Sequence, residues 1–218
     1  MQRGQHSFSS SSKGEGGMHF LTCIDVAGEA VKVGPGVKNF KAGDKVVAKV
    51  NTLTGGGLVE LAVTIMESVT VARPPEVSAA TAIGLPVAGL TAHQALTQPG
   101  GIKLDGSGQQ ANILITAASG IPWSTFEPNL SANGKVIDIT PTLSSLLRVA
   151  LKKLTFSKKQ LMPLFLSPKA DNLEYLIKLV KEGKLKTIID SKYPLVLAED
   201  AWAKISNGHA TGKIIVEP

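Results

Sequence analysis

Short stretches of alternating apolar and polar residues fill the first half of the chain after a Gly/Ser-rich start. The segment 26–34 alternates about Gly28, and 45–48, 58–63 and 69–71 are further apolar runs separated by turn residues. A period of two is typical of half-buried strands. Several short strands at such close spacing predict a small β-barrel-like unit.

The period changes in residues 77–96. Small and apolar residues recur there at helical spacing, and Gly84 and Pro86 divide the run into two predicted helical pieces. Polar residues such as Thr81 and His93 interrupt the run, so it is not a candidate membrane span. We therefore expect a buried helical segment.

Strand-like and helix-like segments alternate in the second half of the chain. The predicted strands are 112–116, 134–139, 186–189 and 213–216, and the predicted helices are 171–183 and 198–206. Residues 124–133 can supply only a short helix. The first two strands are nearly continuous apolar runs, as expected for strands buried on both faces of a parallel sheet. Asp171-x-x-Glu174 predicts a capping box, and Gly183 and Gly208 predict helix ends. The alternation predicts a doubly wound parallel sheet.

The composition fits this mixture of elements. The chain has 218 residues, of which 43% are apolar, 18% charged and 5% aromatic, with 22 Gly and 12 Pro. Such proportions favour an α/β or β-rich globular protein over a helical bundle. Residues 1–17 are too rich in Gly and Ser to bury much apolar surface, so we predict a disordered tail at 1–19. The tail weakly resembles an organelle transit peptide, but it has little arginine and no amphipathic stripe.

The formal net charge of +6 raises the question of an anionic partner. The chain has three Arg and few aromatic residues, and its lysines are spread over turns and helix ends, so nucleic acid is not expected. The densest basic segment is 148–159, which contains Arg148, Lys152, Lys153, Lys158 and Lys159. A solvated surface explains this segment best, and attraction to an anionic membrane is the second interpretation.

Cys23 is the single cysteine, so an internal disulfide is excluded and a reducing compartment is favoured. This Cys and the four His do not have the spacing of zinc ligands, so no metal site is predicted. No general acid, general base or activated nucleophile stands out in the sequence. We therefore assign no catalytic residue.

Four motifs in a fixed order carry a resemblance to a known family. They are Asp25-Val26-Ala27-Gly28-Glu29, Phe40-Lys41-Ala42-Gly43-Asp44-Lys45-Val46, Leu85-Pro86-Val87-Ala88-Gly89-Leu90-Thr91-Ala92 and Ala210-Thr211-Gly212-Lys213-Ile214. In this order they resemble the zinc-free quinone oxidoreductases of the medium-chain dehydrogenase/reductase superfamily, and most of all the plant homologues of the chloroplast envelope. The segments 121–128 and 190–192 are similar to that group too, and the resemblance covers about residues 20–218.

The resemblance implies a GroES-like β-barrel catalytic domain and a Rossmann domain, with NADPH and substrate in the cleft between them. It implies metal-free reduction of quinones or α,β-unsaturated carbonyls by hydride from the nicotinamide. The expected fold class is α/β, a GroES-like β-barrel remnant plus an abbreviated Rossmann-type parallel sheet. The expected boundaries are the tail at 1–19, the catalytic domain remnant at 20–96 and 190–218, and a truncated nucleotide-binding domain at 97–189.

The cofactor-binding residues that the resemblance implies are Thr91, Ala117, Ala118, Ser119, Gly120 and Lys213. Thr91 is equally well explained as a helix-interior threonine, and Lys213 as a lysine that starts an edge strand. Residues 117–120 begin a glycine loop. Such a loop holds a pyrophosphate because its backbone approaches closely and the next helix presents free N–H groups.

The sequence departs from the family directly after this loop. Gly120 is followed by Ile121-Pro122, where the family continues with Gly-Val-Gly and a long helix, and the next βα units have no counterpart. Pro122 has no N–H to donate. The family's first barrel strands are likewise replaced by the unlike residues 1–19. We therefore expect an NADPH-dependent reductase by descent that is shortened and poorly active.

Two alternatives follow from the same departures. The first is a non-catalytic shortened form, peripheral to an anionic membrane or paired with a dimer partner. The second is a chain that does not fold stably, because missing central strands expose apolar surface and unpaired sheet edges. The partners implied by the resemblance are a small-molecule quinone or enone and a second copy in a homodimer. The implied location is the chloroplast envelope, peripherally, and otherwise the cytoplasm.

Overall fold

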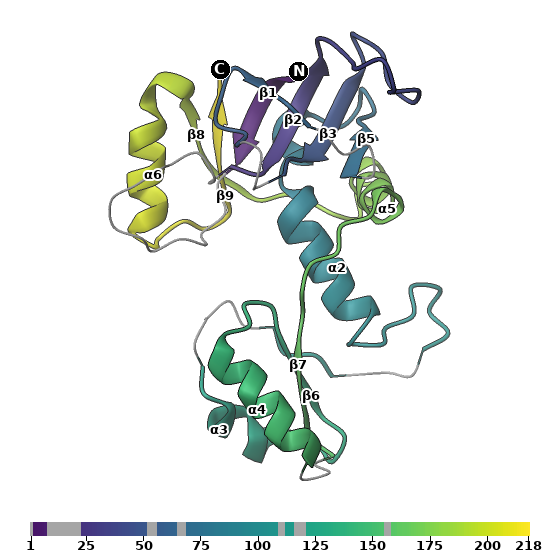
Figure 1. The fold of residues 1–218 in the computed structure, drawn as a ribbon, viewed down its shortest axis with the longest axis vertical. Coiled ribbons are helices and arrows are strands. Elements are labelled where there is room, and N and C mark those ends of the chain that lie inside the picture. Colours follow the sequence, from purple (N-terminus) through teal and green to yellow (C-terminus); the bar gives the residue numbers. More distant parts are fainter. Residues whose placement is uncertain are drawn as a thin grey trace. The chain divides into compact units, whose positions relative to one another are not determined.

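A computed structural model of the chain describes residues 2–7, 23–51, 56–64, 69–108, 112–115, 121–154 and 158–218 (Figure 1). For 2–7 and 152–154 it describes the backbone alone. The chain forms two compact units. The first, unit 1, comprises Met1–Leu90 and Pro168–Pro218, and the second, unit 2, comprises Thr91–Ser167. Each unit is described by itself.

Unit 1 is built on one mixed sheet. Its strands are β1 (Gln2–Ser7), β2 (Asp25–Ala30), β3 (Lys45–Lys49), β4 (Leu61–Ala62), β5 (Thr70–Ala72), β8 (Ile189–Pro194) and β9 (Lys213–Glu217). The strands follow the order β5-β3-β2-β1-β9-β8, and β4 also pairs with β1. All pairs are antiparallel except β8 with β9, which are parallel. The predicted strands at 45–48 and 213–216 are confirmed almost to the residue.

Strand β1 lies inside the range for which the sequence predicts a disordered tail. Its backbone pairs with three strands, β2, β4 and β9. A Gly/Ser-rich segment has few apolar side chains to bury, but pairing in a sheet requires only backbone N–H and C=O groups and neighbouring strands. For 8–19, which lie outside the described residues, the tail stays a prediction.

Three helices and a π-helical turn cover the sheet of unit 1. They are α1 (Ala79–Ala82), the π-helical turn Leu85–Gly89, α5 (Ala170–Lys181) and α6 (Ala198–Ser206). The two predicted helical pieces in 77–96 are present, and the π-helical turn joins them with Pro86 in its first turn, where its missing N–H costs little. The side chain of Ser78 caps α1 by accepting from the backbone N–H of Thr81 at 3.1 Å.

The start of α5 differs from the prediction. Its N-cap is Lys169, with no side-chain cap, so Asp171 lies inside the first turn and the predicted capping box is wrong. Asp171 still suits this place, because a carboxylate near a helix N-terminus faces the positive end of the helix dipole. The predicted helix ends are confirmed, since Gly183 and Gly208 have φ values of 71° and 72°.

Two apolar clusters line the sheet of unit 1. One gathers Cys23, Ala201, Ile214 and Val216, with Trp202 packed against it, and α6 thereby covers β9. The other gathers Val26, Ala48, Val50 and Ala62 on the neighbouring strands. At the β5 end of the sheet, α5 buries Leu173, Leu176 and Ile177 and contacts β5.

Unit 2 contains a small parallel sheet and its helices. The elements are α2 (Leu90–Thr97, which begins at the boundary of the units), α3 (Trp123–Phe126), β6 (Lys135–Asp138), α4 (Leu143–Leu154) and β7 (Gln160–Pro163). Strands β6 and β7 are parallel, with Val136 opposite Leu161. Helix α4 connects them and packs against β7, which makes a βαβ unit.

Two predicted strands need correction. Residues 112–115 are not a strand, and the side chain of Leu114 is 82% exposed. The apolar run predicts burial between other strands, and the described part of unit 2 provides only the pair β6 and β7. The strand predicted at 186–189 instead begins at Ile189, as β8.

Candidate functional site

Lys213 and Asp25 form an ion pair inside unit 1. The Nζ of Lys213 donates to the Oδ2 of Asp25 at 3.3 Å. The Asp25 side chain is fully buried and that of Lys213 is 16% exposed. Removing a carboxylate from water costs several kcal/mol unless a counter-charge and hydrogen bonds compensate. The family resemblance implies that Lys213 lies at the cofactor cleft. In this fold Lys213 also compensates the buried charge of Asp25.

The sequence did not single out Asp25 as a functional residue. It starts β2, where it lies opposite Lys49 of β3 and Ser7 of β1, and β1 separates β2 from β9 in the sheet. The signal in the sequence is an acid embedded between Ile24 and Val26 in a buried strand. That pattern indicates a carboxylate with a partner, but the partner lies 188 residues away along the chain.

The turn that leads into Lys213 is tightly defined. Gly212 has a φ of 128°, and a Cβ there would lie 2.6 Å from the carbonyl oxygen of Ile188. The N–H of Lys213 donates to that same oxygen at 2.9 Å. Thr211 donates its N–H to Oδ2 of Asp190 at 2.9 Å. Two motifs that carry the resemblance, 190–192 and 210–214, thus meet at the start of β8 and β9.

Asp190 is held ionised at this turn. Its Oδ1 pairs with the Nζ of Lys204 on α6. The hydrogen bond from Lys204 is the main reason why the pKa of Asp190 is lowered to about 2 from its usual value of 3.8, and the hydrogen bond from the N–H of Thr211 is the next. A carboxyl group with a lowered folded-state pKa stabilises the fold above its unfolded pKa, and this contribution is lost as the pH falls through the folded pKa.

Asp190→Asn should therefore reduce stability in a pH-dependent way. Wild type should exceed the variant in free energy of unfolding at neutral pH, and the difference should shrink between about pH 4 and pH 2. Urea unfolding across this range measures it. In a Lys204→Met variant, NMR titration should find the pKa of Asp190 moved up toward its usual value. A wild-type minus variant difference that is constant from pH 7 to pH 2 would contradict this assignment.

Thr91 lies in unit 2, on α2, with its side chain partly exposed. One turn further along, Gln94 is fully buried and was not predicted to matter. Its Nε2 donates to the carbonyl of Ser167, and the N–H of Ser167 donates back to Oε1 at 3.1 Å. This reciprocal pair ties α2 to the chain that follows β7. Its signal in the sequence was a glutamine within an apolar helical run.

Residues 117–120, the start of the glycine loop, lie outside the described residues. The chain directly after them is described, and it does not provide the usual phosphate site. Pro122 is the N-cap of α3 without a side-chain cap, and α3 has only 4 residues before a 3-10 turn at Glu127–Asn129. A long helix with free N–H groups is what favours a pyrophosphate. The described residues after the loop therefore do not fit the family's mode of holding NADPH.

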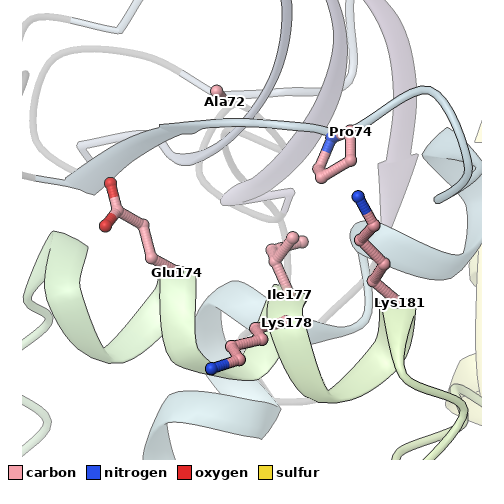
Figure 2. Close-up of a pocket in the computed structure, with 6 residues that line it drawn as sticks. All are labelled: Ala72, Pro74, Glu174, Ile177, Lys178 and Lys181. Carbon is pink, nitrogen blue, oxygen red and sulfur yellow. The ribbon is translucent and has the colours of Figure 1, made fainter.

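Two shallow grooves lie on unit 1, both beside α5. Figure 2 shows the first, where Glu174, Ile177 and Lys181 point from α5 toward the chain of Ala72 and Pro74 while Lys178 points away. The second lies between the α1 region and the end of α5, around Ser78, Thr81 and Val180. Neither includes Thr91 or Lys213. Because polar groups do not converge in the first groove, it does not resemble a small-molecule site.

The described ranges of the chain contain neither a cluster of metal ligands nor a membrane-spanning helix. No group of three or more His, Cys, Asp or Glu gathers there in a way that could hold a metal ion. A zinc ion therefore has no fitting donor set among these residues. Within the described part of the chain, no helix is long and apolar enough to cross a bilayer.

Comparison with known proteins shows which family the chain is similar to. Residues 105–216 match the family model described as zinc-binding dehydrogenase. The chain is 52% identical to the chloroplast envelope quinone oxidoreductase homolog of Arabidopsis thaliana, over 91% of this chain and 80% of that protein. This alignment spans 263 positions, although the chain has 218 residues. Positions of the relative therefore lack a counterpart here.

Two further similarities are more distant. The NADPH-dependent alkenal/one oxidoreductase of Arabidopsis thaliana, a chloroplastic protein, is 26% identical over 89% of this chain and 63% of its own length. The quinone oxidoreductase of Coxiella burnetii has a similar fold, with a TM-score of 0.68 at 20% identity, over 90% of this chain and 78% of that one. The fold is thus of the mixed α/β class of these oxidoreductases, a GroES-like β-barrel remnant plus an abbreviated Rossmann-type parallel sheet. The chain belongs to the quinone oxidoreductases of the medium-chain dehydrogenase/reductase family of oxidoreductases.

Proposed function

We propose that the chain is a shortened NADPH-dependent reductase of quinones or α,β-unsaturated carbonyls that binds its cofactor weakly and reacts slowly. Membership of the oxidoreductase family and the name of the NADPH-dependent alkenal/one relative support the cofactor and the substrate class. The proposed cofactor residues are Thr91, 117–120 and Lys213. No catalytic residue is proposed, since in such enzymes the cofactor carries the chemistry and the protein positions it.

The proposed weak binding of NADPH rests on one observation. After the glycine sequence the chain has Pro122 and the four-residue α3 in place of a long helix. The N–H donors that a pyrophosphate would accept from are therefore reduced in number. A hydrogen bond to a charged group contributes about 1.5–3 kcal/mol, so the loss of two should weaken binding by about 100-fold or more.

The dissociation constant of NADPH is the first measurement. Titration with NADPH, followed by the fluorescence of Trp123 and Trp202, should give a saturable change at a concentration about 100-fold or more above that of the Arabidopsis relative. Oxidation of NADPH in the presence of a quinone, followed by absorbance, should be slow and should depend on both compounds. The full-length relative, measured beside it, is the control.

Three results would change this proposal. Affinity equal to that of the relative would refute the weakness. No saturable response at millimolar NADPH would remove the reductase assignment and leave the non-catalytic form. The absence of a cooperative thermal melt by circular dichroism would show that the chain does not fold stably.

A location and an assembly state belong to the same proposal. The name of the 52% identical relative favours the chloroplast envelope for this chain as well. A fluorescent-protein fusion expressed in plant cells tests the location, and a cytoplasmic signal would contradict it. We also propose a homodimer, in line with the family resemblance. Light scattering coupled to size exclusion should give twice the mass of 22.8 kDa.

A further inference from the structure

Strand β6 has an edge that no other described strand covers. In the described part of unit 2 the sheet consists of β6 and β7 alone. The N–H of Gln160 donates to the carbonyl of Gly134 at 3.0 Å, and the N–H of Leu164 donates to the carbonyl of Asp138 at 2.8 Å. These bonds fix which residues of each strand face the other strand, because successive residues of a parallel strand direct their backbone groups to opposite sides.

The two outer edges of this sheet differ. On β6, Lys135 and Ile137 direct their N–H and C=O groups away from β7, and on β7 the outward residues are Leu161 and Pro163. Pro163 has no N–H, so it blunts the outer edge of β7 against a further strand. Strand β6 contains no proline, so its outer edge retains both donors and acceptors. The β6 edge is therefore the one that suits an added strand.

The run 112–115, in the same unit, has the character of a strand without a partner. Its apolar residues Ile113, Leu114 and Ile115 are 53%, 82% and 80% exposed, and the run belongs to neither a helix nor a strand of the chain. Isoleucine is favoured in strands, and residues 109–116 contain no charge that would oppose pairing. An exposed, uncharged run of this kind tends to pair with a free strand edge.

We propose that the run 112–115 of a second copy of the chain pairs with β6, and that the first copy's run pairs in return with β6 of the second. Within one chain the described residues 112–115 and 135–138 do not pair, so both the run and the edge are left for a partner. Every copy carries both, so a two-fold dimer makes the contact twice and closes. Backbone hydrogen bonds provide the affinity, as in other cases of strand addition.

This inference rests on the homodimer proposed above and names its contact surface. It does not depend on NADPH, since neither 112–115 nor β6 is among the proposed cofactor residues. Light scattering of the full chain over a series of concentrations follows the assembly. The mass should rise from 22.8 kDa to twice that value as the concentration increases.

A charge placed in the run tests the donor side of the contact. Leu114→Lys should raise the dissociation constant of the dimer by about tenfold or more, because a lysine within the added strand opposes its burial. The side chain of Leu114 is 82% exposed, so the substitution should not unfold the monomer. Val196→Lys is the matched control. It makes the same change of charge at a residue that is 89% exposed in unit 1, and it should alter the dissociation constant by less than about twofold.

A proline on each edge of the sheet tests the acceptor side. Ile137→Pro removes an outward N–H of β6, and Leu161→Pro removes an outward N–H of β7, while the bonds between the two strands remain. Ile137→Pro should weaken the dimer by about tenfold or more, and Leu161→Pro by less than about twofold. Unchanged circular dichroism confirms that both variants are folded.

The possible failures point to different errors. A dimer that is unaffected by Leu114→Lys and Ile137→Pro would overturn this inference and leave the homodimer with another interface. A dimer weakened only by Leu161→Pro would assign the interface to β7. Masses well above that of a dimer would overturn the reciprocal pairing, because strands would then add without closing. A monomer at every concentration would refute the homodimer as well, whereas the affinity for NADPH, measured separately, would be untouched.

Discussion

Replacing Lys213 by methionine should lower the free energy of unfolding of unit 1 by about 3–5 kcal/mol. Methionine fills a similar volume but cannot neutralise Asp25, whose side chain is fully buried. Removing one partner of a buried pair leaves the other charge uncompensated, which costs far more than the pair itself contributes. This is the largest single effect that the described ion pairs predict.

Urea unfolding followed by Trp202 measures the change. Trp202 packs against the cluster that contains Ile214, next to Lys213, so its fluorescence reports on this part of unit 1. A Trp123→Phe background removes the signal from unit 2. The matched control is Lys192→Met on the neighbouring strand. Its partner Glu217 lies 2.8 Å away in an exposed pair, so the loss should stay below about 1 kcal/mol.

A double variant separates the ion pair from other tasks of Lys213. Asp25→Asn/Lys213→Met removes both charges, so it should be more stable than Lys213→Met alone. If Lys213→Met proved as stable as wild type, the structural account of the pair would be wrong. A variant that retains stability but loses NADPH affinity would instead assign the lysine to the cofactor.

Local patterns were sufficient to predict much of unit 1. The patterns around Gly28 and in 45–48 predict strands that are present as β2 and β3, although successive residues of both strands are buried and not alternate ones. Gly183 and Gly208 end their helices because the chain needs a positive φ there. The four motifs, taken in order, were enough for the family. These are short-range signals, and short-range physics determines the elements they describe.

The features that were not predicted correctly from the sequence depend on contacts between residues far apart in the chain. The pairing of Asp25 with Lys213 arises only when β9 enters the sheet next to β1. The run 112–115 has the apolar character of a buried strand, yet among the described residues it pairs with neither β6 nor β7, and Leu114 and Ile115 are largely exposed. Whether an apolar segment becomes a central strand is decided by its neighbours.

Gly212→Ala should lower the free energy of unfolding of unit 1 by about 3 kcal/mol or more. At a φ of 128° an alanine is strained by itself, at about 1–3 kcal/mol. Its Cβ would also meet the carbonyl oxygen of Ile188 at 2.6 Å, a contact that forces backbone to move. That oxygen accepts the N–H of Lys213, so the shift weakens the hydrogen bond that starts β9.

Gly208→Ala is the control that separates the two causes. Gly208 has a φ of 72°, yet a Cβ there would have no atom within 4 Å. The substitution should therefore cost only about 1 kcal/mol, the ordinary penalty for alanine in a left-handed conformation. Equal losses at 208 and 212 would mean that backbone strain alone explains both. A larger loss at 212 would instead identify contact with Ile188 as the feature that fixes the approach to Lys213, and with it the position of the lysine against Asp25.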